Sequence, residues 1–238
     1  MRSTYSLLVV IGLVSMALPA TQARANMIIS VSATAGGLSG SQEFNIPCDG
    51  GLADWSVSGP VAITSGGTTL GTIREMALQT DSEPYVNLHF AVEAAGIDTT
   101  FVVTSSTVTF SALANPQAYA SAGITLTSDG NGATVTGSFA GGKTYQARYN
   151  GATVFDSLVS GFTIAGDQTV TGSDRNPPSG YTGISGSVSS IQSEFNFTLS
   201  ALDQASGTSR FEVVPEPATL ALLAFGGATM LLRRRRRT

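Results

Sequence analysis

The sequence predicts an all-β protein, an antiparallel β-sandwich that is jelly-roll-like, flanked by an N-terminal signal helix and a C-terminal transmembrane helix. Between residues 27 and 212, apolar and polar residues alternate with a period of two, which is typical of strands with one buried face. Glycine pairs and Asn-Gly steps separate these runs and favour turns. Two apolar segments, each close to arginine, lie outside this pattern at the two ends of the chain.

Residues 1–25 have the three parts of a secretory signal peptide. Arg2 gives a basic start, residues 7–18 are apolar, and a proline follows them. Ala23 and Ala25 then supply the small-x-small pattern that precedes a cleavage site. We therefore expect cleavage after Ala25 and export of the rest of the chain.

Residues 26–212 are expected to form a single all-β extracytoplasmic domain. Strict alternation is clearest in residues 85–92 and 143–149. Asn150-Gly151 directly follows the second of these runs and predicts a hairpin. A parallel β-solenoid is the competing fold, but the glycine-rich spacing has no fixed repeat period.

Three parts of this body are less regular. Residues 71–80 are the stretch in which a helix is the alternative to a strand. Residues 168–186 are expected to be a long loop, because two adjacent prolines within them cannot pair in a central strand. Residues 208–212 are expected to form a last strand before a proline-bounded linker.

The C-terminal end combines a short motif, an apolar segment and a basic cluster. The motif is Pro215, Glu216 and Pro217, and the apolar segment runs from Ala218 to Leu232. Fifteen helical residues reach about 22 Å, less than the ~30 Å of a bilayer core, but arginine stems extend such a span. The basic cluster consists of Arg233, Arg234, Arg235, Arg236 and Arg237. These cations predict a membrane anchor with its basic end in the cytoplasm.

This arrangement resembles the PEP-CTERM sorting signal, in which Val-Pro-Glu-Pro precedes an apolar helix and an arginine cluster at the C-terminus. The resemblance covers residues 213–238, and it implies a route of sorting rather than an activity of the body. It implies an exported bacterial protein that exosortase processes, with the inner membrane as a transient partner and exopolysaccharide as a further candidate partner. The alternative is a plain single-pass anchor with a proline-rich hinge.

Charge and cysteine content exclude several classes of function. Between Arg24 and Arg233, five basic residues stand against sixteen acidic ones, a net charge of −11. Such a balance repels phosphate backbones, so nucleic acid is not an expected partner. With one cysteine, Cys48, and one histidine, His89, neither a Cys/His metal cluster nor an internal disulfide can form. We expect Cys48 to be buried.

The sequence offers no catalytic constellation, and no catalytic residue, metal or cofactor is predicted. Any histidine-dependent mechanism would need His89, which falls on the more polar face of its strand and is expected at the surface. Asp49 with Asp54, and Asp129 with Asn131, place oxygen atoms on glycine-rich loops that suit calcium. Both loops are equally ordinary turn sequences.

Aromatic rings are the other candidate feature, because flat rings stack on sugars. The aromatic candidates in the body are Trp55, Tyr85, Tyr119, Tyr145, Tyr149 and Tyr181. We expect Trp55 in the core rather than on a binding platform, because aromatic side chains dominate core burial.

These observations favour an exported protein, transiently anchored in the inner membrane, with a structural or adhesive body at the cell surface or in the exopolysaccharide matrix. One alternative is a carbohydrate-binding module of that matrix. The other is an extracellular glycoside hydrolase that uses two carboxylates. With sixteen acidic residues, some pair lies at a suitable distance in any fold, so the acidic content does not decide this alternative.

Overall fold

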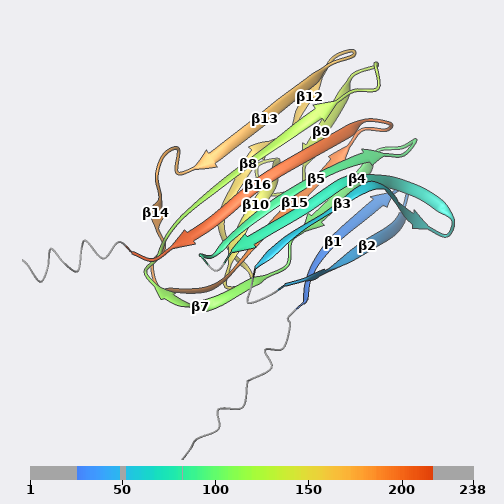
Figure 1. Ribbon diagram of the computed structural model, residues 1–238. Coiled ribbons are helices and arrows are strands. Elements are labelled where there is room, and N and C mark those ends of the chain that lie inside the picture. The colour runs from blue at the N-terminus through green and yellow to red at the C-terminus, as the bar shows by residue number, and fades with distance from the viewer. Residues whose placement is uncertain (1–25, 49–51, 82, 217–238) are drawn as a thin grey trace, which may run out of the picture.

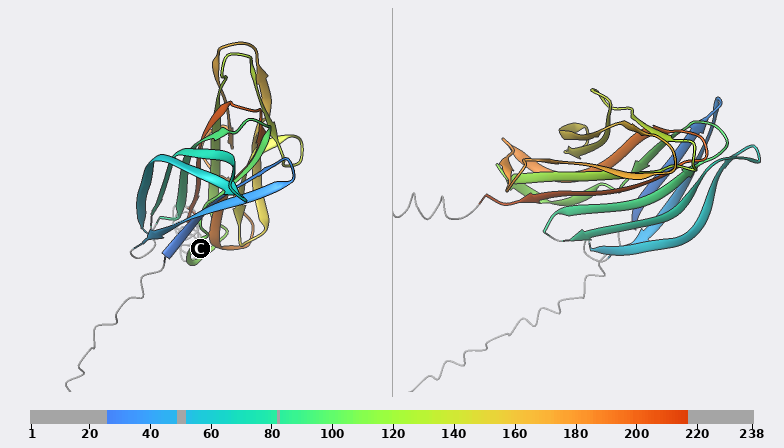
Figure 2. Two further views of the ribbon diagram at one scale, coloured as in Figure 1. Left: turned by 90° about the vertical axis from the view of Figure 1, so that its right-hand side faces the viewer. Right: turned by 90° about the horizontal axis from the view of Figure 1, so that it is seen from above.

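The computed structural model describes residues 26–48, 52–81 and 83–216. These residues form sixteen strands and no helix, arranged as two antiparallel sheets packed face to face (Figure 1, Figure 2). The β-sandwich predicted from the alternating pattern is therefore confirmed. The jelly-roll connectivity stays a prediction, and the expected signal and transmembrane helices lie outside the described residues.

The first sheet contains the N-terminal strand. Its strands are β1 (Asn26–Ala35), β2 (Leu38–Pro47), β6 (Thr99–Thr104), β7 (Val108–Ala114), β9 (Ala133–Gly137), β10 (Lys143–Tyr149), β11 (Thr153–Ser160), β12 (Phe162–Ile164) and β15 (Ser187–Leu199). Their order is β11-β10-β15-β6-β1-β2, with β7 and β9 paired to β15 and β12 paired to β9.

The second sheet contains the C-terminal strand. Its strands are β3 (Ala53–Ser65), β4 (Thr68–Asp81), β5 (Tyr85–Ala94), β8 (Gln117–Thr127), β13 (Thr169–Asn176), β14 (Thr182–Gly183) and β16 (Gln204–Val214). Their order is β13-β8-β16-β5-β4-β3, and β14 pairs with β8 (Figure 1). The strand that leads into the C-terminal tail thus lies inside the sheet, paired on both sides.

Aromatic side chains from both sheets fill the space between them. Phe90 of β5 lies with its ring centroid 4.9 Å from Phe195 and 5.9 Å from Phe197, both on β15. Tyr145 of β10 packs on Phe195 at 4.9 Å. All four side chains are fully buried. This inter-sheet cluster holds the second sheet in a fixed position above the first.

The structure confirms some of the predictions for individual segments and corrects others. The hairpin at Asn150-Gly151 is confirmed, with positive φ at both residues, and residues 208–212 are strand within β16. Residues 71–80 belong to strand β4, so a helix there is wrong. The loop predicted over residues 168–186 is also wrong in part, because Thr169–Asn176 forms the edge strand β13. That strand is largely exposed on both faces, so it lacks the apolar alternation that marks other strands.

Candidate functional site

The outer face of the second sheet carries rows of side chains that run across the strands. In an antiparallel sheet, residues directly opposite one another lie side by side on one face. One such row is Arg175, Ser121, Arg210, Asn87 and Gln79, from β13, β8, β16, β5 and β4 in turn. In the three central strands the residues that flank this row are buried, so the row itself points away from the core.

The adjacent row is built from smaller residues. It consists of Ser173, Gly123, Thr208, His89 and Ala77 on the same five strands. Because Gly123 has no side chain and Ala77 has only a methyl group, the surface is hollowed here. The result is a trough of about 870 Å³ that crosses the sheet, within the size range of small-ligand sites. The trough is lined by both rows together with Leu88, Ala122, Thr171, Asp174, Pro178 and Ser209.

A third row supports the arginines of the trough. Glu212 lies between Tyr119 and Tyr85 in the sheet register. The guanidinium of Arg175 lies 4.6 Å above the centre of the Tyr119 ring, and that of Arg210 lies 4.3 Å above the Tyr85 ring. These are cation–π distances. Arg210 also donates through Nε to Glu212 Oε2 at 2.7 Å. Each ring thus holds one guanidinium group at the side of the trough.

Contacts and burial within the same cluster raise the pKa values of three of its members. Tyr181 donates its hydroxyl hydrogen to Glu212 Oε1 at 2.7 Å, and this bond raises the pKa of Tyr181 to about 12. Burial raises the pKa of Tyr119. Burial acts to lower the pKa of Arg210, but Glu212 outweighs it and the pKa is raised. The phenols therefore stay neutral and the arginine stays charged.

His89 lies in the trough rather than on a plain surface. Its side chain is 36% exposed, and its Nε2 lies 3.5 Å from Glu75 Oε2. This agrees with the polar face predicted for it. The sequence did not show that this face is hollowed.

The aromatic candidates are divided between the core and the rim of the trough. Tyr145 is fully buried and its hydroxyl lies 2.9 Å from Ser193 Oγ. Trp55 is half-buried with its ring 5.3 Å from that of Phe44, and Tyr149 is half-buried as well. Tyr85, Tyr119 and Tyr181 gather beside the trough.

Of the two alternatives for calcium, the loop with Asp129 and Asn131 has turn geometry, whereas Asp54 lies in strand β3. Asp129 Oδ1 accepts from the backbone N–H of Asn131 at 3.3 Å, and the Asn131 amide donates to Asp129 Oδ2 at 3.4 Å. Asp54 accepts from Gln79 at 3.4 Å, and Asp49 lies outside the described residues. Within the described ranges no three His, Cys, Asp or Glu side chains are grouped to hold a metal ion. Cys48 is buried, as expected.

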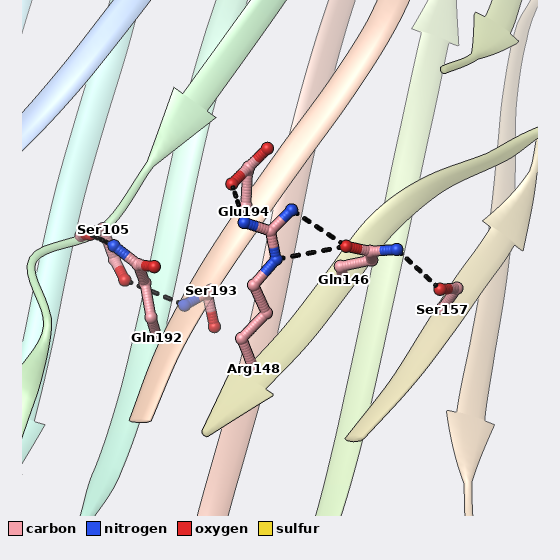
Figure 3. A network of polar contacts seen from close by, with 7 residues as sticks. All are labelled: Ser105, Gln146, Arg148, Ser157, Gln192, Ser193 and Glu194. Carbon is pink, nitrogen blue, oxygen red and sulfur yellow. Dashed lines mark hydrogen bonds and ion pairs between the residues drawn. The ribbon is translucent and has the colours of Figure 1, made fainter. Parts of the chain in front are cut away.

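The outer face of the first sheet carries a polar network (Figure 3). Arg148 Nη1 lies 3.0 Å from Glu194 Oε2 and the same guanidinium donates to Gln146 Oε1 at 2.9 Å. Gln146 in turn donates to Ser157 Oγ at 3.1 Å. Burial raises the pKa of Glu194, and Arg148 opposes this shift. The groups of this network satisfy one another.

Apart from His89, sequence reasoning missed the residues that line the trough. Arg175 and Arg210 are two of only five basic residues between Arg24 and Arg233, and this scarcity was the one available signal. Gly123 gave none, because a lone glycine in a strand has several explanations. The rows become visible only once the register is known.

The predicted sorting signal, residues 213–238, begins within the last two residues of β16. Val214 is the last residue of the strand, and Pro215 and Glu216 follow it in an exposed, irregular segment. Pro217, the apolar segment, the arginine cluster and the signal peptide with Ala23 and Ala25 all lie outside the described residues. Among the residues that the structure does describe, none forms a helix suited to crossing a membrane.

Two of the solved structures with some similarity to this chain come from infectious bursal disease virus. A chain in the structure of infectious bursal disease virus Gt strain is 10% identical to this one. The match covers 92% of this chain and 69% of that chain, with a TM-score of 0.15. The Gx strain gives 11% identity, coverage of 92% and 70%, and a TM-score of 0.13. TM-scores this low carry no argument about fold or function.

Sequence comparison separates the body from the tail. No curated protein sequence is significantly similar to this chain. A family model, however, matches residues 213–237, and that match contains the Pro-Glu-Pro motif, the apolar segment and the arginine cluster. The motif implies export of the protein, exosortase processing and membrane-anchored sorting before placement at the cell surface. The C-terminal tail of this chain is a PEP-CTERM protein-sorting motif.

Proposed function

We propose that this exported protein is a non-enzymatic adhesive component of the exopolysaccharide matrix, and that its body binds polysaccharide through the trough. The proposal joins the structural or adhesive role with the carbohydrate-binding role that the sequence left as an alternative. In it, residues 26–212 act as one jelly-roll-like domain, the chain is anchored in the inner membrane only in transit, and exosortase then releases it to the surface or matrix.

The observation that carries this proposal is the shape of the trough. It is open to solvent, crosses five strands, and has side chains on both sides that donate or accept hydrogen bonds. Open grooves with polar walls suit an extended chain of hydroxyl-rich units, since each unit meets groups from a different strand. The three tyrosines at the rim add ring surface beside the polar wall.

Carboxylate-dependent hydrolysis has less support. It needs two carboxyl groups about 5–10 Å apart facing one substrate. Among the described lining residues Asp174 is the one carboxylate, and its Oδ2 lies 3.5 Å from Lys143 Nζ. Glu75 lies beside the trough near His89, but it does not belong to the lining.

The binding proposal is tested by filling the trough from its floor. A Cβ added at Gly123 would lie 3.6 Å or more from its nearest neighbours, so Gly123→Val is expected to leave the melting temperature nearly unchanged. We expect the native full-length protein, purified in detergent, to bind a set of acidic and neutral oligosaccharides in calorimetry. Gly123→Val should weaken that binding at least tenfold, because the side chain occupies the floor.

The matched control is Thr100→Val, which alters a half-buried residue on the outer face of the first sheet. It should leave saccharide binding unchanged. Failure of the native protein to bind any saccharide in the set would overturn the proposal.

Sorting is tested separately by deletion of Pro215, Glu216 and Pro217. We expect the deleted protein to stay in the inner-membrane fraction, because the segment that the processing enzyme meets is gone. Unchanged release into the medium would contradict the sorting part of the proposal.

A further inference from the structure

Arg175 differs from the other described arginines and lysines in its surroundings. Four of these cations each lie within 4.0 Å of a carboxylate. They are Arg74 with Glu93, Lys143 with Asp174, Arg148 with Glu194, and Arg210 with Glu212. Within residues 26–48, 52–81 and 83–216, Arg175 is the one basic side chain without such an ion pair. It also lines the trough.

The guanidinium of Arg175 is nevertheless held in place. It lies 4.6 Å above the Tyr119 ring, and its Nη2 donates to the backbone oxygen of Gly180 at 3.1 Å. An arginine side chain has five N–H donors in a rigid plane, so most of its donors are not used by this contact. A fixed guanidinium with donors to spare is suited to bidentate binding of a carboxylate.

The charge around Arg175 favours an anion at this end of the trough. Arg175, Arg210 and Lys143 stand against Asp174 and Glu212 there, since Lys143 lies 3.5 Å from Asp174 and Arg210 contacts Glu212. This is a local excess of one positive charge in a chain that carries −11 between Arg24 and Arg233. The rest of the body repels a polyanion, and this end attracts it.

A second polar side chain in the same row, Asn87, also lines the trough. Asn87 Oδ1 is buried and has no hydrogen-bond partner. Asn196 Oδ1 on the first sheet has the same lack, so an unpartnered oxygen alone marks no site. Asn87 lies three strands from Arg175 in register, which is roughly 14 Å at the usual strand spacing. That distance requires an extended ligand.

We propose that the polysaccharide bound in the trough is acidic, and that Arg175 pairs with the carboxylate of a uronic acid unit while a unit farther along the chain lies over Asn87. This rests on the proposed function. Arg175 selects the charge of the ligand, and the rest of the trough binds the chain of sugar rings.

The test compares an acidic oligosaccharide with its neutral counterpart on the full-length protein in detergent. The probes are an oligogalacturonate and the oligogalactose obtained by reducing its carboxyl groups. We expect the native protein to bind the oligogalacturonate at least tenfold more tightly in calorimetry. Arg175→Gln should reduce this ratio to near one while it leaves binding of the neutral probe intact, which also shows that the variant is folded.

Two further variants separate charge from geometry. Arg175→Lys keeps the charge but loses the planar pair of donors, so its preference for the acidic probe should be intermediate. Arg74→Gln removes one positive charge outside the trough lining and should keep the full preference.

The results that would contradict the acidic ligand differ from those that would contradict the proposed function. Equal binding of both probes by the native protein, or an unchanged preference in Arg175→Gln, overturns the acidic ligand and leaves the proposed function standing. Absence of binding to either probe, and to the wider set of saccharides, overturns the proposed function and this inference together.

Discussion

Two glycines on neighbouring strands of the second sheet face opposite sides and differ in what lies above them. Gly207 of β16 faces the core, where the ring of Phe90 lies directly on its backbone, so that an added Cβ would overlap the ring. Gly123 of β8 faces outward, and the nearest atoms to an added Cβ are 3.6 Å away. A glycine inside a strand commonly marks the close approach of another group.

The two glycines serve different purposes in the same sheet. The space above Gly207 is filled by the protein itself, and the chain gains core packing from it. The space above Gly123 is the floor of the trough, which is open to a molecule from outside. The same residue type therefore serves folding on one face and, in our proposal, recognition on the other.

The largest effect is expected from placing a methyl group on each glycine in turn. Gly207→Ala should lower the free energy of unfolding by about 3 kcal/mol, because the Phe90 ring is packed against Phe195 and Phe197 and cannot move aside. Gly123→Ala should change it by no more than about 0.5 kcal/mol. Urea unfolding of the two variants measures the difference. Equal destabilisation would show that the two faces are packed alike.

A second contrast concerns two tyrosines whose pKa values are both raised to about 12. Burial raises the pKa of Tyr145 in the core, whereas the hydrogen bond to Glu212 raises that of Tyr181 at the exposed rim. For Tyr145 the folded pKa lies above the ordinary value of 10.0. Its contribution to stability is therefore complete below pH 10 and is lost as the pH rises towards 12.

The expected loss is measured by unfolding at a series of pH values across this window. A shift of about two pKa units corresponds to about 3 kcal/mol. Tyr145→Phe should flatten the fall in stability between pH 10 and pH 12, while Tyr181→Phe should leave it in place, since solvent screens the exposed pair. An unchanged slope in Tyr145→Phe would mean that another group controls alkaline unfolding.

Much of the fold could be predicted because it depends on patterns among residues that are neighbours in the sequence. Alternation within residues 85–92 identified which face of β5 is buried, and Asn150-Gly151 identified a hairpin. The edge strand β13 escaped because its threonines pair with threonines of β8, as Thr171 does with Thr125 at 2.8 Å. Hydroxyl pairing leaves no apolar pattern in the sequence.

The trough could not be predicted for a different reason. Its first row joins Arg175 to Ser121, and Arg210 to Asn87, residues far apart in the sequence. Their meeting depends on the register of strands that long connections bring together, and register is set by the whole core rather than by local pattern. The tail was readable because its motif, apolar segment and cations are contiguous.

The smallest effect is expected on the outer face of the first sheet. Thr100 Oγ1 and Thr198 Oγ1 lie 2.7 Å apart on neighbouring strands. Thr100→Val keeps the shape of the side chain and removes one hydroxyl, so the free energy of unfolding should fall by about 1 kcal/mol or less.

The saccharide affinity of Thr100→Val tests whether the ligand lies on the first sheet or on the second. Thr100→Val should bind the oligosaccharides as the native protein does, because Thr100 lies on the first sheet, on the opposite face of the sandwich from the trough. A loss of affinity in Thr100→Val equal to that in Gly123→Val would place the ligand on the first sheet. If only Gly123→Val reduces the affinity, the ligand lies over Gly123, the glycine whose outer side no other side chain of the described residues covers.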